Sequence, residues 1–139
     1  RQVMNLGKRY GVKVLIENVG LRTKNNVLFD LPEYIALFDI FPQAGALLDT
    51  GHAHVNGWDI PAVVKALGER LAACHVHDND GSGDAHLPVG QGDIDWKAYF
   101  GAVKKYAPQA TQVFEYCCGF GNTKDLEAHI AELKADYKL

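Results

Sequence analysis

Short apolar runs alternate with amphipathic segments four times along the chain. The apolar runs show no clean alternation of polar and apolar positions, which is typical of strands that helices cover. We predict strands over residues 12–17, 44–49, 71–77 and 111–116. Strands joined by right-handed helical crossovers form a parallel sheet, so the pattern indicates an α/β fold of four βα units.

Helix start and stop signals lie between the predicted strands. Residues 1–10 have the pattern of a helix end, which Gly11 stops. Asp30, Asp59 and Asp95 each precede a helical segment, and their side chains are suited to cap its first turn. The last helix begins at Asn122 or Thr123, and its apolar stripe comprises Leu126, Ile130, Leu133 and Tyr137.

Each predicted strand ends in a side chain that can bind a metal. These side chains are Glu17, Asp49, His75 and Glu115. The carboxyl ends of parallel strands lie on one rim of the sheet, where α/β folds place their chemistry. Oxygen-rich coordination with one nitrogen suits Mn²⁺, Mg²⁺ or Co²⁺, and Zn²⁺ also accepts it. The pattern therefore predicts a divalent metal site on this rim.

Further candidates follow the second and third strands. His52 lies just beyond Asp49 and could reach the same ion, a neighbouring ion or a substrate. His77 falls on the same side of its strand as His75, so it could be a second ligand or a supporting group. We expect Asp78 to orient a neighbouring imidazole through a hydrogen bond.

A loop after the third strand carries Asp84 and His86, two residues apart, which form a workable chelating pair. The Gly-x-Gly that follows lacks the third glycine and the strand–turn–helix setting of a dinucleotide site. We interpret it as a turn into the helix that Asp95 caps.

Composition limits the function classes. The chain has 139 residues, 47% hydrophobic and 22% charged, which we interpret as a single domain over residues 1–139. A net charge of −3 without runs of like charge gives no support for a nucleic-acid surface, and no apolar stretch reaches the length of a membrane span. Three cysteines without a Cys-x-x-Cys pair predict reduced thiols in a cytoplasmic protein. Because the chain begins at Arg1 inside a helical pattern, we expect a piece of a longer protein.

The ordered series IEN, LLDTGH, HVHDND with DAHLPVGQGDIDW, and FEY resembles the xylose-isomerase-like TIM barrels. That superfamily includes sugar-phosphate isomerases and epimerases, and endonuclease-IV-type apurinic endonucleases. The resemblance covers nearly the whole chain and aligns it with the C-terminal half of a barrel, strands five to eight. A complete (β/α)₈ barrel takes about 250 residues. The half-barrel needs closure by a second copy, a missing half or rearranged packing, and we expect a homodimer.

The resemblance implies roles for the candidate residues. In the ketose epimerases of this superfamily, one divalent ion, often manganese, is held by residues that match Glu17, Asp49, His75 and Glu115. The two glutamates also exchange protons with the substrate carbon, and a histidine matching His52 contacts the sugar. In the endonuclease branch, an Asp-x-His binds metal.

That Asp-x-His matches Asp84 and His86 of this chain. We expect His86 either to bind metal or to contact substrate. The chain departs from both branches, because it lacks the N-terminal histidines of the endonucleases. It also has Thr23 and Gly81 where the epimerases tend to place a Glu and an Arg that grip the sugar.

Three functions follow from these observations. The first is a metal-dependent sugar or sugar-phosphate isomerase or epimerase, with Glu17 and Glu115 transferring a proton at the carbon α to a carbonyl. The second is a metal phosphodiesterase acting on abasic DNA, against which the acidic net charge counts. The third is a non-catalytic, metal-binding fragment of such a barrel.

Overall fold

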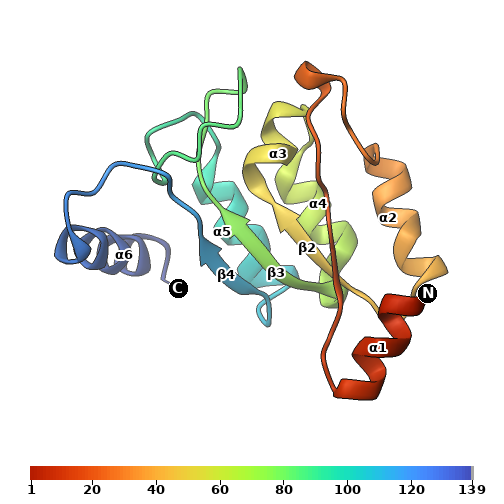
Figure 1. Ribbon diagram of the computed structural model, residues 1–139. Helices are drawn as coiled ribbons and strands as arrows, with labels where there is room; N and C mark the ends of the chain where they lie inside the picture. Colours follow the sequence, from red (N-terminus) through yellow and green to blue (C-terminus); the bar gives the residue numbers. More distant parts are fainter. Residues whose placement is uncertain (139) are drawn as a thin grey trace.

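A four-stranded parallel sheet forms the centre of the fold, in a computed structural model that describes residues 1–138 (Figure 1). The strand order follows the chain, β1–β2–β3–β4, and every neighbouring pair is parallel. The four predicted strands are confirmed, although each is shorter than predicted. Their bounds are Leu15–Glu17, Gly45–Asp49, Leu71–Val76 and Thr111–Phe114.

The helices begin and end at the residues that signal them. The side chains of Asp30, Asp59 and Asp95 accept hydrogen bonds from backbone amides in the first turns of α2, α4 and α5, and Asn122 caps α6 in the same way. Gly11 ends α1 in the left-handed conformation, with a φ of 66°. The helices are α1 Gln2–Tyr10, α2 Leu31–Ile40, α3 Thr50–Val55, α4 Ile60–Leu67, α5 Trp96–Tyr106 and α6 Thr123–Tyr137, with 3₁₀ turns at Arg22–Lys24 and Gly68–Arg70.

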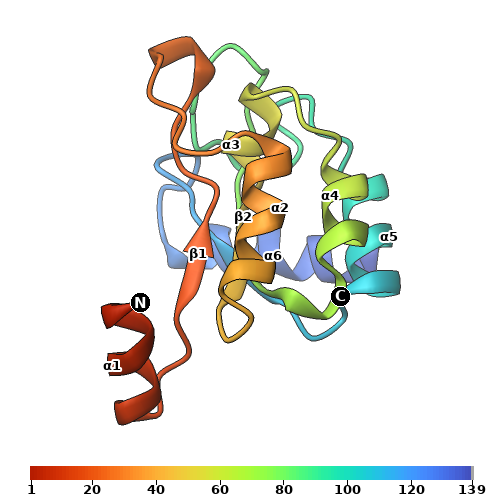
Figure 2. The same ribbon diagram turned by 90° about the vertical axis from the view of Figure 1, so that its right-hand side faces the viewer.

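The core lies between the sheet and its helices. In Figures 1 and 2, α4 and α5 lie together along one face of the sheet, and α2 lies beside them. Alternate residues of β2 and β3, such as Leu48 and Cys74, point to this layer and are fully buried. They join the buried rings of Tyr34, Phe38 and Tyr99 in one hydrophobic cluster. This packing fixes the direction in which the opposite residues of each strand point.

Within the described residues 1–138, the other face of the sheet carries no such helix layer. It presents Leu15, Leu47 and Val113, and the Val113 side chain is 40% exposed. Strand alternation places Glu17, Asp49 and His75 on the same face, at the carboxyl ends of their strands. Closure of this sheet by a second copy stays a prediction.

No helix within residues 1–138 is long and apolar enough to span a membrane. Cys74, Cys117 and Cys118 are free in the structure, with Cys74 buried and both Cys117 and Cys118 exposed.

Candidate metal centre

The four residues predicted from the strand ends lie together on one rim of the sheet. The Nδ1 atom of His75 lies 3.4 Å from Glu17 Oε1, 3.4 Å from Glu115 Oε2 and 3.8 Å from Asp49 Oδ2. Glu17 comes from β1 and Glu115 follows β4, so the two glutamates approach His75 from opposite edges of the sheet. Three carboxylates and one imidazole thus converge on one small volume.

Asp49 is the most buried of these residues, and its side chain is 1% exposed. The side chain of Asn18 clamps the Asp49 backbone, because it accepts from Asp49 N at 2.7 Å and donates to Asp49 O at 3.0 Å. Oδ1 of Asp49 accepts from the amide of His52 at 2.7 Å and so caps α3. Oδ2 lies 3.1 Å from His77 Nε2. The Asp49 carboxylate therefore lies next to His75 on the rim and also next to His77, which follows β3.

Asp49 and His77 stabilise each other's charged forms. Burial disfavours the Asp49 carboxylate, but the hydrogen bond and charge of His77, together with the charge of His52, outweigh it, and its pKa lies below the usual value. Burial likewise disfavours a charged His77, but Asp49, with smaller effects from Asp84 and Glu115, raises its pKa. The rim is thus built to hold Asp49 ionised.

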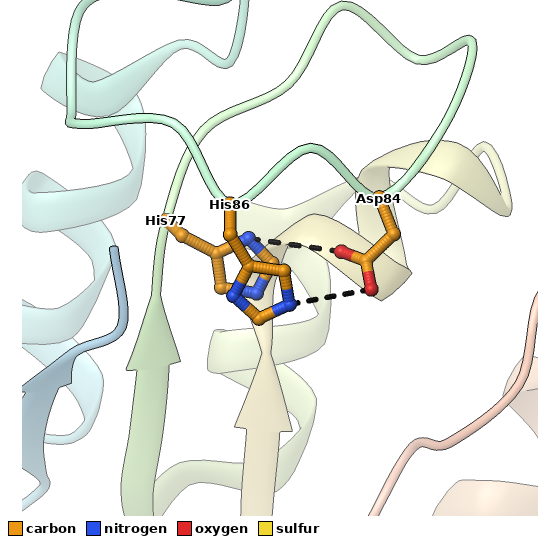
Figure 3. A group of neighbouring side chains, drawn as sticks. All are labelled: His77, Asp84 and His86. Atoms are coloured by element: carbon orange, nitrogen blue, oxygen red, sulfur yellow. Dashed lines mark ion pairs between the residues drawn. The ribbon is translucent and has the colours of Figure 1, made fainter. Parts of the chain in front are cut away.

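A second group of ligand atoms, on His77, Asp84 and His86, lies beside the first, and Figure 3 shows this second group. Asp84 Oδ2 is 3.3 Å from His86 Nε2 and 3.3 Å from His52 Nε2, and Asp84 Oδ1 is 3.8 Å from His77 Nδ1. The rings of His77 and His86 stack with centroids 3.8 Å apart. The structure therefore brings His52, Asp84 and His86 next to the strand-end residues.

Asp78 fixes the loop that carries Asp84 and His86, and our expectation that it orients an imidazole is wrong. Its buried carboxylate accepts from the amides of Gly90 and Ile94 and, at 2.7 Å, from Trp96 Nε1. Its backbone pairs with that of Leu87 in an isolated bridge. These four partner residues of Asp78 lie 9 to 18 positions later in the chain, so no local pattern could reveal them.

His77 is the candidate site residue whose role the sequence left open. It is fully buried between Asp49 and the Asp84 loop. Gly51 makes room for it, because a Cβ atom at that position would collide with the His77 ring. The i, i+2 spacing of His75 and His77 was the available signal, and it could not distinguish a ligand from a supporting group.

The unpartnered polar atoms of the site fit a bound cation. Among residues 1–138, three buried side-chain atoms lack a hydrogen-bond partner: His52 Nδ1, His77 Nδ1 and Asp84 Oδ1. Buried polar atoms without partners cost free energy, and native structures normally satisfy them. All three belong to this site.

Three sets of residues offer ligand atoms within 4.8 Å of one another, namely Glu17–Asp49–His75, Asp49–His77–Glu115 and His77–Asp84–His86. These nitrogen and oxygen donors suit the divalent ions predicted from sequence.

The chain matches a known protein family and a known protein. The sequence pattern of the family described as xylose isomerase-like TIM barrel matches residues 1–135. An uncharacterized protein of Methanocaldococcus jannaschii, MJ1614, is 31% identical over 104 residues, which make up 73% of this chain and 38% of that protein.

Solved structures share the fold. A D-tagatose 3-epimerase-like protein has a TM-score of 0.77 and 25% identity, covering 98% of this chain and 50% of its own. The D-allulose 3-epimerase of Methylomonas sp. has a TM-score of 0.78 and 18% identity, covering 98% and 52%. A second structure of that enzyme, in complex with D-allulose, has a TM-score of 0.69 and 20% identity, covering 94% and 44%. The chain spans about half the length of these structures, and its sheet matches about half of a TIM barrel.

Proposed function

The chain belongs to the xylose isomerase-like TIM barrel family, and we propose that it acts as a metal-dependent isomerase or epimerase of sugars or sugar phosphates. The observation that carries this proposal is the pair of glutamates at 3.4 Å from either side of His75. The solved structures with this fold include enzymes named as epimerases of ketoses such as D-allulose.

Glu17, Asp49, His75 and Glu115 would hold the divalent ion. Their donor set accommodates Mn²⁺, Mg²⁺, Co²⁺ or Zn²⁺. When bound there, the ion would polarise the substrate's carbonyl and its neighbouring hydroxyl.

The two glutamates would move the proton. Epimerisation removes a proton from one face of a carbon and returns one to the other face, so it needs an acid–base group on each side. Glu17 and Glu115 come from the two edge strands, and their side chains are 28% and 37% exposed, so a substrate can reach both. One glutamate, ionised, would accept the proton at an Oε atom, and the other, protonated, would donate a proton to the opposite face of the carbon.

His52 and His86 would orient the substrate. Nδ1 of His86 lies 3.1 Å from the carbonyl of Glu115, which directs Nε2 toward Asp84 and the site. His52 Nδ1 lies 3.9 Å from Glu17 Oε1, close enough to share a substrate hydroxyl with it. Both imidazoles can donate hydrogen bonds to sugar oxygens.

We further propose that the sheet works as part of a closed barrel, with a second copy of the chain as the partner that closes it. The partly buried Leu15 and Leu47, the exposed Val113 and the two free edge strands support this proposal. A homodimer would place a wall opposite the metal site and keep bulk water from it.

Proton exchange on a panel of ketoses tests the function. The protein with Mn²⁺ should exchange the proton at the carbon beside the carbonyl with solvent deuterium and form the epimer, as observed by NMR. Glu17→Gln and Glu115→Gln should each abolish exchange, whereas Glu127→Gln, a change at an exposed position of α6, should not. Metal-bound protein that leaves every ketose unchanged would instead support a non-catalytic metal-binding fragment.

The second group of ligand atoms favours one alternative, a phosphodiesterase acting at abasic DNA. Two ions close together could activate a water and stabilise a leaving oxygen, and His77, Asp84 and His86 offer a second set of ligands beside the first. Metal stoichiometry and an assay with a duplex that contains an abasic site distinguish the two functions. A single bound ion and an intact duplex would remove this alternative.

A further inference from the structure

Two exposed thiols lie side by side next to the site, and no function described above uses them. Cys117 and Cys118 are free, and their Sγ atoms are 3.4 Å apart. They follow β4 directly, two and three residues after Glu115. The third cysteine, Cys74, is fully buried in the helix-facing core.

We propose that Cys117 and Cys118 form a redox-sensitive dithiol, which a peroxide converts to a disulfide. One sulfur attacks a peroxide oxygen, the O–O bond breaks, and a sulfenic acid and water form. The second sulfur then attacks the sulfenic sulfur, the S–O bond breaks, and a second water leaves. Two electrons pass from the thiols to the peroxide, and both thiol protons end in water.

The geometry favours a reversible switch over a structural crosslink. Neighbouring Cα atoms are about 3.8 Å apart, which is shorter than the span of about 4.4–6.8 Å usual for disulfides. The resulting bond is strained and exposed, and such disulfides are easily reduced and act as labile, regulatory ones. Cys74 does not compete for the oxidant, because its side chain is fully buried in the core.

The dithiol is connected to the loop that carries Asp84 and His86. The amide of Cys117 donates to His86 O at 3.1 Å, and its thiol lies 3.3 Å from Ala85 O as a donor. A disulfide has no S–H, so oxidation removes the hydrogen bond from the Cys117 thiol to Ala85 O. It also strains the backbone at Cys117, whose amide donates to His86 O. The expected consequence is a loosened loop, and this part of the inference rests on the proposed role of that loop.

Intact mass spectrometry tests the modification without any measurement of activity. Treatment of the metal-free protein with hydrogen peroxide should lower its mass by about 2 Da. The hydrodynamic size should stay the same, and dithiothreitol should restore the mass. Cys118→Ser should abolish the loss, whereas Cys74→Ala should retain it. Gain of oxygen on a single cysteine, a crosslinked dimer or an unchanged mass would overturn the proposal.

Hydrogen–deuterium exchange tests the connection to the loop. Amides in residues 80–92 should exchange faster in the oxidised form than in the reduced form. Cys117→Ser keeps a hydroxyl that can donate to Ala85 but forms no disulfide, so its loop should stay protected under peroxide. Equal exchange in oxidised and reduced wild-type protein would remove the connection while leaving the modification itself standing. Neither experiment depends on sugar turnover, so failure of the proposed function would leave both results interpretable.

Discussion

Asp49 is the residue at which the two groups of ligand atoms meet. One carboxylate oxygen faces His52 and the other faces both His75 and His77. The residue is fully buried and its backbone is clamped by Asn18, so it cannot move away when its charge is lost. Its replacement should therefore affect metal binding across the whole site.

Asp49→Asn and Glu115→Gln should each lower Mn²⁺ affinity at least tenfold, because each removes a charged oxygen from the ligand set while keeping the shape of the side chain. Isothermal titration calorimetry on the metal-free protein measures this directly, with Glu127→Gln as the matched control on α6. Unchanged affinity in both site variants would contradict a shared metal site.

Asn18→Ala should also weaken binding, by about ten- to a hundredfold, which is the usual effect of removing a group that orients a ligand. The same titration measures it. Because the Asn18 side chain hydrogen-bonds to the backbone of Asp49 and not to its carboxylate, a normal affinity would show that this clamp does not position the carboxylate.

The sequence correctly predicted which residues lie close together where strand geometry alone determines their positions. Glu17, Asp49, His75 and Glu115 lie together because parallel strands in register end on one rim. The partners of Asp78 were predicted wrongly, because they come from a loop whose path depends on tertiary contacts. Whether the four rim residues bind metal stays a prediction.

At the scale of elements, the first turn of α3 packs directly against the His77 ring. Gly51 lies in this turn, and a Cβ atom there would come within 2.1 Å of a ring carbon. The nearest atoms belong to a buried ring held by Asp49, so the collision cannot be relieved by rotation into solvent. Only glycine fits at this position.

Gly51→Ala should destabilise the protein by about 1–3 kcal/mol, as overpacking of a filled core does, and should displace His77. Gly101→Ala in α5 is the matched control, since no atom lies near its Cβ position, and alanine should stabilise that helix by about 1 kcal/mol. Urea unfolding of both variants measures the difference. Equal stability of the two would contradict the described packing of α3.

Most helices were predicted from their capping residues, but α3 was not. Its six residues, Thr50–Val55, are too few to show an apolar period. Its capping residue is Asp49, which also ends β2, so the sequence pattern marked that position as a strand end alone. The Asp49 side chain caps this helix by accepting from the amide of His52, a second role that the strand pattern did not reveal.

At the scale of the whole molecule, alternation of strands and helices predicted the parallel sheet but could not identify what closes it. A local pattern reports which side chains share a face, and it contains no information about a partner outside the chain. The exposed Val113 and the free edges of β1 and β4 mark where such a partner would bind.

Sedimentation velocity at micromolar concentration should show a dimer. Val113→Glu should convert it to a folded monomer, because a charge at the centre of an apolar interface is costly to bury. Far-ultraviolet circular dichroism would verify that the variant keeps its fold. A wild-type protein that sediments as a stable monomer would contradict closure by a second copy.

We propose that the carboxyl ends of the four strands form one divalent metal site. An anomalous difference map recorded at the absorption edge of the bound metal, from crystals grown with Mn²⁺, tests it most directly. We predict a peak bounded by Glu17, Asp49, His75 and Glu115. A map without a peak on this rim, or with metal bound only elsewhere on the protein, would contradict it.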